Sequence, residues 1–171
     1  MTERYKGLNL NFKYGNKYKN LLISQGLIRP KKINTKIGWI TLFELTSKGK
    51  IVLRDIGHMV NDSSEGIVHK YWKYIIAENY RKKGFDVSVK EYINGRPDIF
   101  AAENGKRIAI EIETGKSDAI GNIQRALKAG FDEVICIATN HKAEEKIRKE
   151  LDSIPVDRRK IMLCNTFNIC T

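Results

Sequence analysis

The chain has 171 residues, of which 42% are hydrophobic and 30% charged, and this composition is typical of a soluble globular protein. Its length allows one ordinary domain with a small additional segment, because domains usually hold about 100–150 residues. No apolar run approaches the roughly 20 residues that cross a bilayer, and the first residues show no signal-peptide pattern. Three cysteines without metal-ligand spacing favour a reducing compartment. We therefore expect a cytoplasmic protein without a membrane-spanning segment.

The net charge of +11 is concentrated near the N-terminus. Residues 1–60 contain 12 Lys and Arg against 3 Asp and Glu, whereas residues 61–171 contain 19 against 17. A polyanion is the natural partner of such a segment, and nucleic acid is favoured over a membrane because no strongly amphipathic basic helix accompanies the charge. A basic, solvated face without a partner is the alternative.

The first segment, residues 1–60, is predicted to hold two helices around a basic hairpin. In chain order, the pattern predicts a helix over 17–25, strands over 28–33 and 39–45, and a helix over 47–56. This arrangement resembles the later part of a winged-helix domain, with its opening helix truncated or absent. On that interpretation the segment grips DNA through Arg29, Lys31, Lys32, Lys36, Trp39 and Lys48. A module that only supports dimerisation is the alternative, as is a packing role for Trp39.

The second segment, residues 61–171, alternates helical and strand patterns. The polar residues at 61–64 offer an N-cap for its first helix. In chain order, we predict a helix over 65–83, strands over 85–91, 98–102 and 107–113, a helix over 118–129, a strand over 133–139, a helix over 142–151 and a strand over 161–165. The order α-β-β-β-α-β-α-β predicts an α/β fold with a mixed central sheet flanked by helices.

The turn Asn104-Gly105 fixes a register for the hairpin, because Asn-Gly is the strongest short hairpin signal. If these are the two loop residues, Asp98 lies opposite Glu111, and Glu113 shares the face of Glu111. Three acids then converge on one face, while the isoleucines between them point into a core. Directly opposed like charges destabilise a sheet, so a divalent cation is expected to compensate them. The alternative is that Glu111 and Glu113 are only the polar positions of a half-buried strand.

Arg96-Pro97-Asp98, followed by a hairpin and Glu111-Ile112-Glu113, resembles the motif of the PD-(D/E)XK nuclease superfamily. The resemblance covers roughly residues 62–140 and implies a restriction-endonuclease-like core of order α-β-β-β-α-β. It also implies that Asp98 and Glu111 bind Mg²⁺ or Mn²⁺, with help from the main-chain carbonyl of Ile112.

The chain departs from that pattern at Glu113, where the family usually has lysine. A glutamate there could act as a general base or bind a second metal ion. Lys116 is a candidate for the missing charge, with a solvated loop lysine as the alternative. Glu65 matches an acid that many family members place beside the metal, or else it serves the first turn of its helix. Gln124 resembles a glutamine of some nuclease branches, or else it faces solvent.

These observations predict an Mg²⁺-dependent deoxyribonuclease, an endonuclease that hydrolyses phosphodiester bonds of duplex or branched DNA without a small-molecule cofactor. A homodimer is implied by the resemblance only. The first alternative is a non-catalytic DNA-binding protein with a degenerate nuclease core. The second is an interaction module attached to a translocating ATPase or a mobile-element protein. His58, His69 and His141 lack metal-ligand spacing, and each is expected on a helix surface or in the core.

Overall fold

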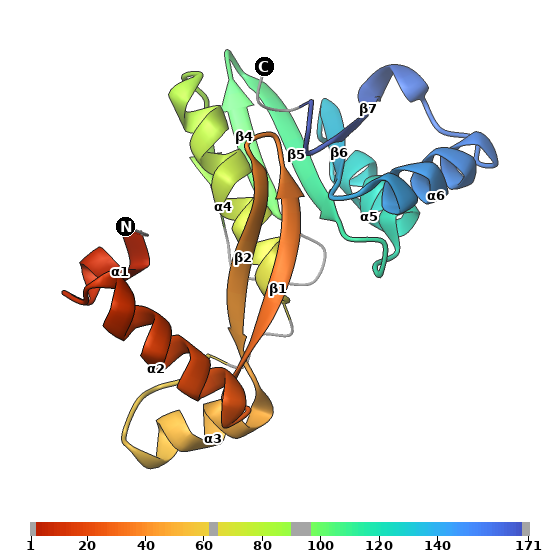
Figure 1. The fold of residues 1–171 in the computed structure, drawn as a ribbon. Helices are drawn as coiled ribbons and strands as arrows, with labels where there is room; N and C mark the ends of the chain where they lie inside the picture. The colour runs from red at the N-terminus through yellow and green to blue at the C-terminus, as the bar shows by residue number, and fades with distance from the viewer. Residues whose placement is uncertain (1–2, 62–64, 90–96, 169–171) are drawn as a thin grey trace. The chain divides into compact units, whose positions relative to one another are not determined.

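The structure, a computed structural model, describes residues 3–61, 65–89 and 97–168. The chain divides near residue 62 into two compact units, each with its own sheet, and residues 35–37 are assigned to the second unit (Figure 1). None of the described helices has the length and hydrophobicity that crossing a membrane requires.

The first unit is built from helices and one hairpin. Its elements are α1 (Glu3–Gly7), α2 (Phe12–Ser24), β1 (Ile28–Thr35), β2 (Gly38–Leu45) and α3 (Ser47–Asp55). The predicted order of this unit is confirmed from residue 17 onward, but α2 begins earlier than predicted. Asn11 caps α2 by accepting a hydrogen bond from the Tyr14 backbone N–H at 3.0 Å. Gly15 interrupts the apolar pattern because it packs against Tyr5, where a Cβ would lie 2.6 Å from a ring carbon.

The second unit is a mixed α/β fold with a five-stranded sheet. Its elements are α4 (Ile67–Lys82), β3 (Asp86–Ser88), β4 (Ile99–Glu103), β5 (Lys106–Glu113), α5 (Ala119–Lys128), β6 (Glu133–Ala138), α6 (His141–Asp152), the 3₁₀ helix η1 (Arg158–Lys160) and β7 (Ile161–Asn165). The strands follow the order β3-β4-β5-β6-β7, antiparallel up to β5 and parallel from there. The predicted element order is confirmed. The end of the predicted strand 85–91 lies outside the described residues.

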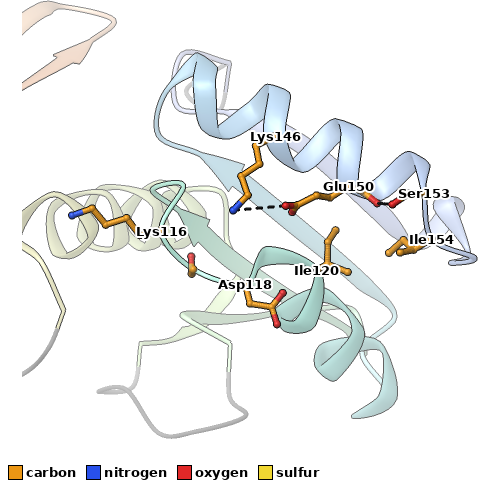
Figure 2. A pocket seen from close by; sticks show the side chains of 8 residues that line it. Lys116, Asp118, Ile120, Lys146, Glu150, Ser153 and Ile154 are labelled. Atoms are coloured by element: carbon orange, nitrogen blue, oxygen red, sulfur yellow. Dashed lines mark hydrogen bonds and ion pairs between the residues drawn. The ribbon is translucent and has the colours of Figure 1, made fainter.

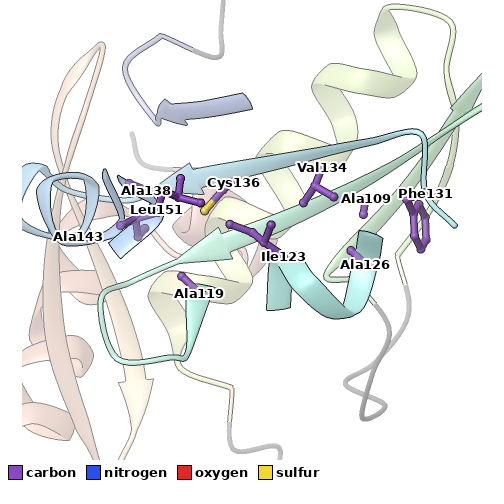
Figure 3. Close-up of a cluster of buried hydrophobic side chains, with 11 residues drawn as sticks. Ala109, Ala119, Ile123, Ala126, Phe131, Val134, Cys136, Ala138, Ala143 and Leu151 are labelled. Atoms are coloured by element: carbon purple, nitrogen blue, oxygen red, sulfur yellow. The ribbon is translucent and has the colours of Figure 1, made fainter. Parts of the chain in front are cut away.

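Helices α5 and α6 cover one face of this sheet because each connects parallel neighbours in the same direction, and such crossovers are right-handed. Between them and the sheet lies a core of small and branched side chains (Figure 3). Ala109 of β5 and the register partner Val134 of β6 both belong to this core. Glu111 and Glu113 lie two and four positions after Ala109 on β5. Their side chains therefore share its face and point toward α5 and α6.

The opposite face of the sheet packs against α4. Ile108, Ile110 and Ile112 are at most 5% exposed, as the prediction of a core on this side of β5 requires. Helix α4 contributes the buried side chains of Trp72 and Ile76. Strand β5 is thus covered on both faces from Ile108 onward, which differs from the half-buried strand considered as an alternative.

The hairpin between β4 and β5 has the predicted register. Glu103 pairs with Lys106 and Ile99 pairs with Ile110. The turn residues Asn104 and Gly105 both have positive φ angles, 50° and 79°, as a tight two-residue turn of this kind demands. Continued by one residue, this register places Asp98 opposite Glu111.

Candidate functional site

Acidic side chains gather at the edge of the second sheet where β4 begins and the parallel strands β5 and β6 end. Asp98 immediately precedes β4, and Glu111 and Glu113 lie near the end of β5. Open α/β sheets commonly bind ligands outside the carboxyl ends of their strands. The β4–β5 hairpin therefore brings these acids to an edge at which α/β sheets commonly bind ligands.

Asp98 connects α4 to β5. Its Oδ2 lies 2.9 Å from Nε2 of His69 on α4 and accepts a hydrogen bond of 2.8 Å from the backbone N–H of Ile112. The side chain of Asp98 is 14% exposed. The carboxylate is thus fixed from two directions and retains access to solvent.

Glu65 approaches the same place from the start of α4. The prediction that Glu65 lies on this helix is wrong, because Gly66 is the N-cap and the helix begins at Ile67. The first turn contains no acidic residue, so Glu65 does not serve it as a first-turn acid. The predicted cap residues 62–64 lie outside the described residues. Glu65 Oε1 instead accepts a hydrogen bond of 2.9 Å from Lys73 Nζ.

His69 lies between the two carboxylates. Its Nδ1 is 2.7 Å from Glu65 Oε1, an electrostatic contact that lacks the alignment of a hydrogen bond. Burial alone would lower the pKa of His69, yet the hydrogen bond and negative charge of Asp98, together with Glu65, outweigh it and raise the pKa. His69 lies on α4 and is half-buried, as a helix-surface or core position predicts, and in addition it contacts two carboxylates.

Glu65, His69 and Asp98 form the one group among the described residues that could hold a metal ion. Each offers a ligand atom, and these atoms lie within 4.8 Å of one another. Two of the predicted metal ligands, Glu65 and Asp98, are in this group. Glu111 and Glu113 are not members of this group, although the charges of Asp98 and Glu113 act on Glu111.

Glu111 is buried beside the group, with 6% of its surface exposed. Its register partner on β6 is Cys136, a buried thiol. Burial is the main reason that the pKa of Glu111 rises to about 8, and the charges of Asp98 and Glu113 add to it. A backbone hydrogen bond from Asp98 opposes the rise. Glu111 therefore holds its proton at neutral pH.

Glu113 is engaged at both carboxylate oxygens. Ser117 Oγ donates to Oε2, and Asn122 Nδ2 of α5 donates to Oε1 at 2.9 Å. Burial raises the pKa of Glu113, while these two hydrogen bonds lower it in part. Arg125 in turn donates to the Asn122 oxygen. Glu113 thus links the end of β5 to the start of α5.

Gln124 is exposed on α5 and lies about 200° around the helix axis from Asn122, since each residue turns a helix by about 100°. The structure places Asn122, and not Gln124, against the acids. The solvent-facing alternative for Gln124 matches its observed position.

Lys116 is exposed in the loop after β5 and makes no hydrogen bond or ion pair with a described residue. It lines an open hollow of about 470 Å³ between this loop and α6 (Figure 2). Lys146 and Glu150 of α6 form an ion pair of 3.7 Å at this hollow. The observed position is that of a solvated loop lysine.

All the predicted DNA-contacting residues except Lys36 belong to the first unit. Lys31, Lys32, Lys36 and Trp39 are exposed, and Trp39 retains 71% of its surface, so the packing role considered for it is wrong. Arg29 pairs with Glu44 at 2.6 Å, and Lys48 Nζ donates to the Gln25 carbonyl at 2.9 Å.

The two faces of β1 divide its basic residues, because side chains alternate along a strand. Arg29 and Lys31 share the face of the buried residues Ile33 and Thr35, whereas Lys32 lies on the other face. The hairpin therefore does not present all its charges on one surface.

Sequence reasoning missed three residues of the site: His69, Lys73 and Asn122. The spacing of Glu65, His69 and Lys73 at intervals of four carries a signal, since residues four apart share a helix face. This spacing could have predicted that His69 and Lys73 share a face of α4, with Glu65 just before the helix. Asn122 had no comparable signal.

Comparison with known proteins provides little further information. No protein-family model and no curated protein matches the chain. The chain is similar to the crystal structure of AF1548, a protein of unknown function, with 18% sequence identity and a TM-score of 0.38. The similarity covers 56% of this chain and 56% of that chain, so it spans little more than half of either protein. These comparisons assign neither a family nor an activity.

Proposed function

We propose that the second unit is a metal-dependent DNA endonuclease core of the PD-(D/E)XK type. The observation that carries the proposal is the meeting of Asp98 with Glu65 and His69 at the strand edge, within 4.8 Å of one another. The hairpin register and the α-β-β-β-α-β order agree with the same interpretation. A mixed sheet with helices on both faces is a common architecture, so the acids and not the fold support the activity.

The donor set fits a divalent cation. Two carboxylates suit Mg²⁺ and Mn²⁺, and an imidazole nitrogen favours Mn²⁺ or another transition metal over Mg²⁺. His69 Nδ1 is buried without an in-line hydrogen bond, which leaves a lone pair or a proton to be satisfied. Glu65, His69 and Asp98 would hold the ion, and Glu111 would join them only after losing its proton.

A bound Mg²⁺ or Mn²⁺ would activate a water molecule and neutralise charge on the phosphate. The chain's own residues would orient the carboxylates that hold the ion. Ile112 and His69 fix the Asp98 carboxylate through their hydrogen bonds. Glu113 has both oxygens occupied by Ser117 and Asn122, which favours a positioning role over that of general base or second metal ligand.

The first unit would bring DNA to the core. Its excess of positive charge suits phosphate contacts, and exposed Lys32, Lys36 and Trp39 are suited to the backbone and to a sugar or base. The winged-helix interpretation of this unit and a homodimer belong to the same proposal.

Nicking of supercoiled plasmid in Mg²⁺ and in Mn²⁺ tests the proposal. Asp98→Asn removes the charge and keeps an oxygen that can accept the Ile112 N–H, so we expect at least about a hundredfold loss of cleavage with the fold retained. Glu103→Gln, at an exposed acid of the same hairpin, is the matched control and should cleave as the wild type does. DNA binding without metal-dependent cleavage, in both metals and on duplex and branched substrates, would favour the non-catalytic alternative.

A further inference from the structure

Lys73 is a basic residue in an unusual environment. It lies in the middle of α4, between the buried residues Trp72 and Ile76, and only 5% of its surface is exposed. Among the described residues, it is the one buried Lys or Arg. Burial of a lysine is costly unless its charge is paired, so its partners indicate its role.

The partners of Lys73 are the carboxylates of the candidate metal group. Its Nζ donates to Glu65 Oε1 at 2.9 Å and lies 4.0 Å from Asp98 Oδ1. His69, one helical turn earlier, contacts the same two carboxylates. Lys73 therefore approaches the metal group from the interior of the protein.

Two features of the site require a cation here. Glu65 and Asp98 lie close together, and like charges at such separations repel unless a positive charge lies between them. At the end of β5, the buried Glu113 adds a further acid whose electrostatic environment includes Asp98. The exposed Lys116 has no contact with the acids, so Lys73 is the lysine that reaches them.

We propose that Lys73 is a positioning residue that serves as the resident counter-ion of Glu65 and Asp98. This inference rests on the proposed function for its link to catalysis. In the metal-free protein, the ammonium group holds the two carboxylates together. If a divalent ion binds, the same ammonium group would keep the two carboxylates in place and would weaken the binding of the ion by electrostatic repulsion.

The test compares Lys73→Met, Lys73→Arg and the control Lys82→Met, with Mn²⁺ alone as the probe. Lys82 is an exposed lysine at the end of the same helix. We expect Lys73→Met to bind Mn²⁺ at least threefold more tightly than Lys82→Met in calorimetric titration. Lys73→Arg keeps the charge and should bind Mn²⁺ within twofold of the wild type. Equal or weaker Mn²⁺ binding by a Lys73→Met protein that is folded without the ion overturns the proposal.

Thermal unfolding provides the second readout. Lys73→Met should lower the melting temperature of the metal-free protein, and saturating Mn²⁺ should restore most of the difference from Lys82→Met because the ion replaces the missing charge. An unfolded Lys73→Met that folds on addition of Mn²⁺ supports the inference. The inference is overturned if Lys73→Met stays unfolded with and without Mn²⁺, or if Mn²⁺ does not reduce its loss of melting temperature. Either result shows that the role of Lys73 is purely structural.

Cleavage separates this inference from the proposed function. If the wild type nicks plasmid, the cleavage rate of Lys73→Met should be at least about tenfold lower, while its affinity for Mn²⁺ is higher. Retained cleavage would overturn the catalytic part of the inference. If the wild type nicks no DNA, the proposed function fails, and the Mn²⁺ titration and unfolding experiments still decide whether Lys73 is the counter-ion.

Discussion

His69 Nε2 lies 2.9 Å from Asp98 Oδ2, although 29 positions separate the two residues in the chain. The contact joins α4 on one face of the sheet to the start of β4. Because His69 Nδ1 also contacts Glu65, one imidazole bridges two carboxylates that would otherwise repel. Helix α4 therefore holds the acids in place. The sequence motif of the hairpin contains no information about this helix.

Replacement of His69 should weaken divalent-ion binding. We expect His69→Gln to raise the Mn²⁺ dissociation constant by about tenfold or more, because a metal ligand or its orienting partner is lost. Isothermal titration calorimetry measures this change. The exposed His141 provides the control, and His141→Gln should bind Mn²⁺ as the wild type does. Equal affinities of the two variants would remove His69 from the site.

Glu111 should make stability depend on pH. The folded protein keeps a proton on Glu111 up to a pKa of about 8, whereas the ordinary value is 4.5. The folded state thus binds more protons between these values, so the free energy of unfolding falls as pH rises through this window and levels off above it. The raised pKa of His69 acts in the same direction.

Glu111→Gln should reduce the slope of the unfolding free energy against pH by an amount on the order of 1 kcal/mol per pH unit. Urea unfolding at several pH values between about 5.5 and 8.5 measures the slope. Glu103→Gln, at an exposed acid, should keep the wild-type slope. Parallel curves for all three proteins would contradict the assignment of a buried, protonated Glu111.

Asn122 should matter more for stability than Gln124. Asn122→Ala leaves one oxygen of the buried Glu113 without its hydrogen bond, which we expect to cost about 1–3 kcal/mol of unfolding free energy. Gln124→Ala removes only an exposed side chain and should stay within about 0.5 kcal/mol of the wild type. Chemical denaturation of the two variants measures the difference. A larger loss for Gln124→Ala would show that α5 is oriented differently.

The basic hairpin should give DNA binding a steep salt dependence. Each phosphate contact contributes about −0.9 to the slope of log K against log salt. Lys32→Gln combined with Lys36→Gln should therefore reduce the magnitude of the slope by up to about 2. Lys142→Gln combined with Lys149→Gln, at exposed positions of α6, is a control of equal charge and should keep the wild-type slope. Fluorescence anisotropy at several salt concentrations measures all three proteins, and equal slopes would show that the hairpin does not grip phosphates.

The hairpin was predictable because its information is local. Asn104 and Gly105 accept positive φ angles, and this turn alone fixes the pairing from Glu103 back to Ile99. The burial of Ile108, Ile110 and Ile112 follows from the same alternation. The late predicted start of α2 has a physical cause, because the glycine that interrupts its pattern, Gly15, fits against the ring of Tyr5.

The environment of the acids was not predictable, because it depends on contacts between distant elements. The pattern places His69 and Lys73 on α4 but cannot show that they face Asp98, which belongs to another element. The burial of the face of β5 that carries the acids was not predictable for a similar reason. Glu111 and Glu113 look like solvent-facing positions in an alternating strand, yet the parallel pairing with β6 and the packing of α5 bury both.

A crystal soaked in Mn²⁺ and measured near the manganese absorption edge tests most directly whether this edge of the sheet holds a divalent ion. We expect an anomalous peak bonded to the Asp98 carboxylate, with Glu65 or His69 as a second protein ligand, and no peak in crystals of Asp98→Asn. A peak only elsewhere, or none at Mn²⁺ concentrations that saturate the protein in solution, would contradict the proposed metal site and the nuclease mechanism with it.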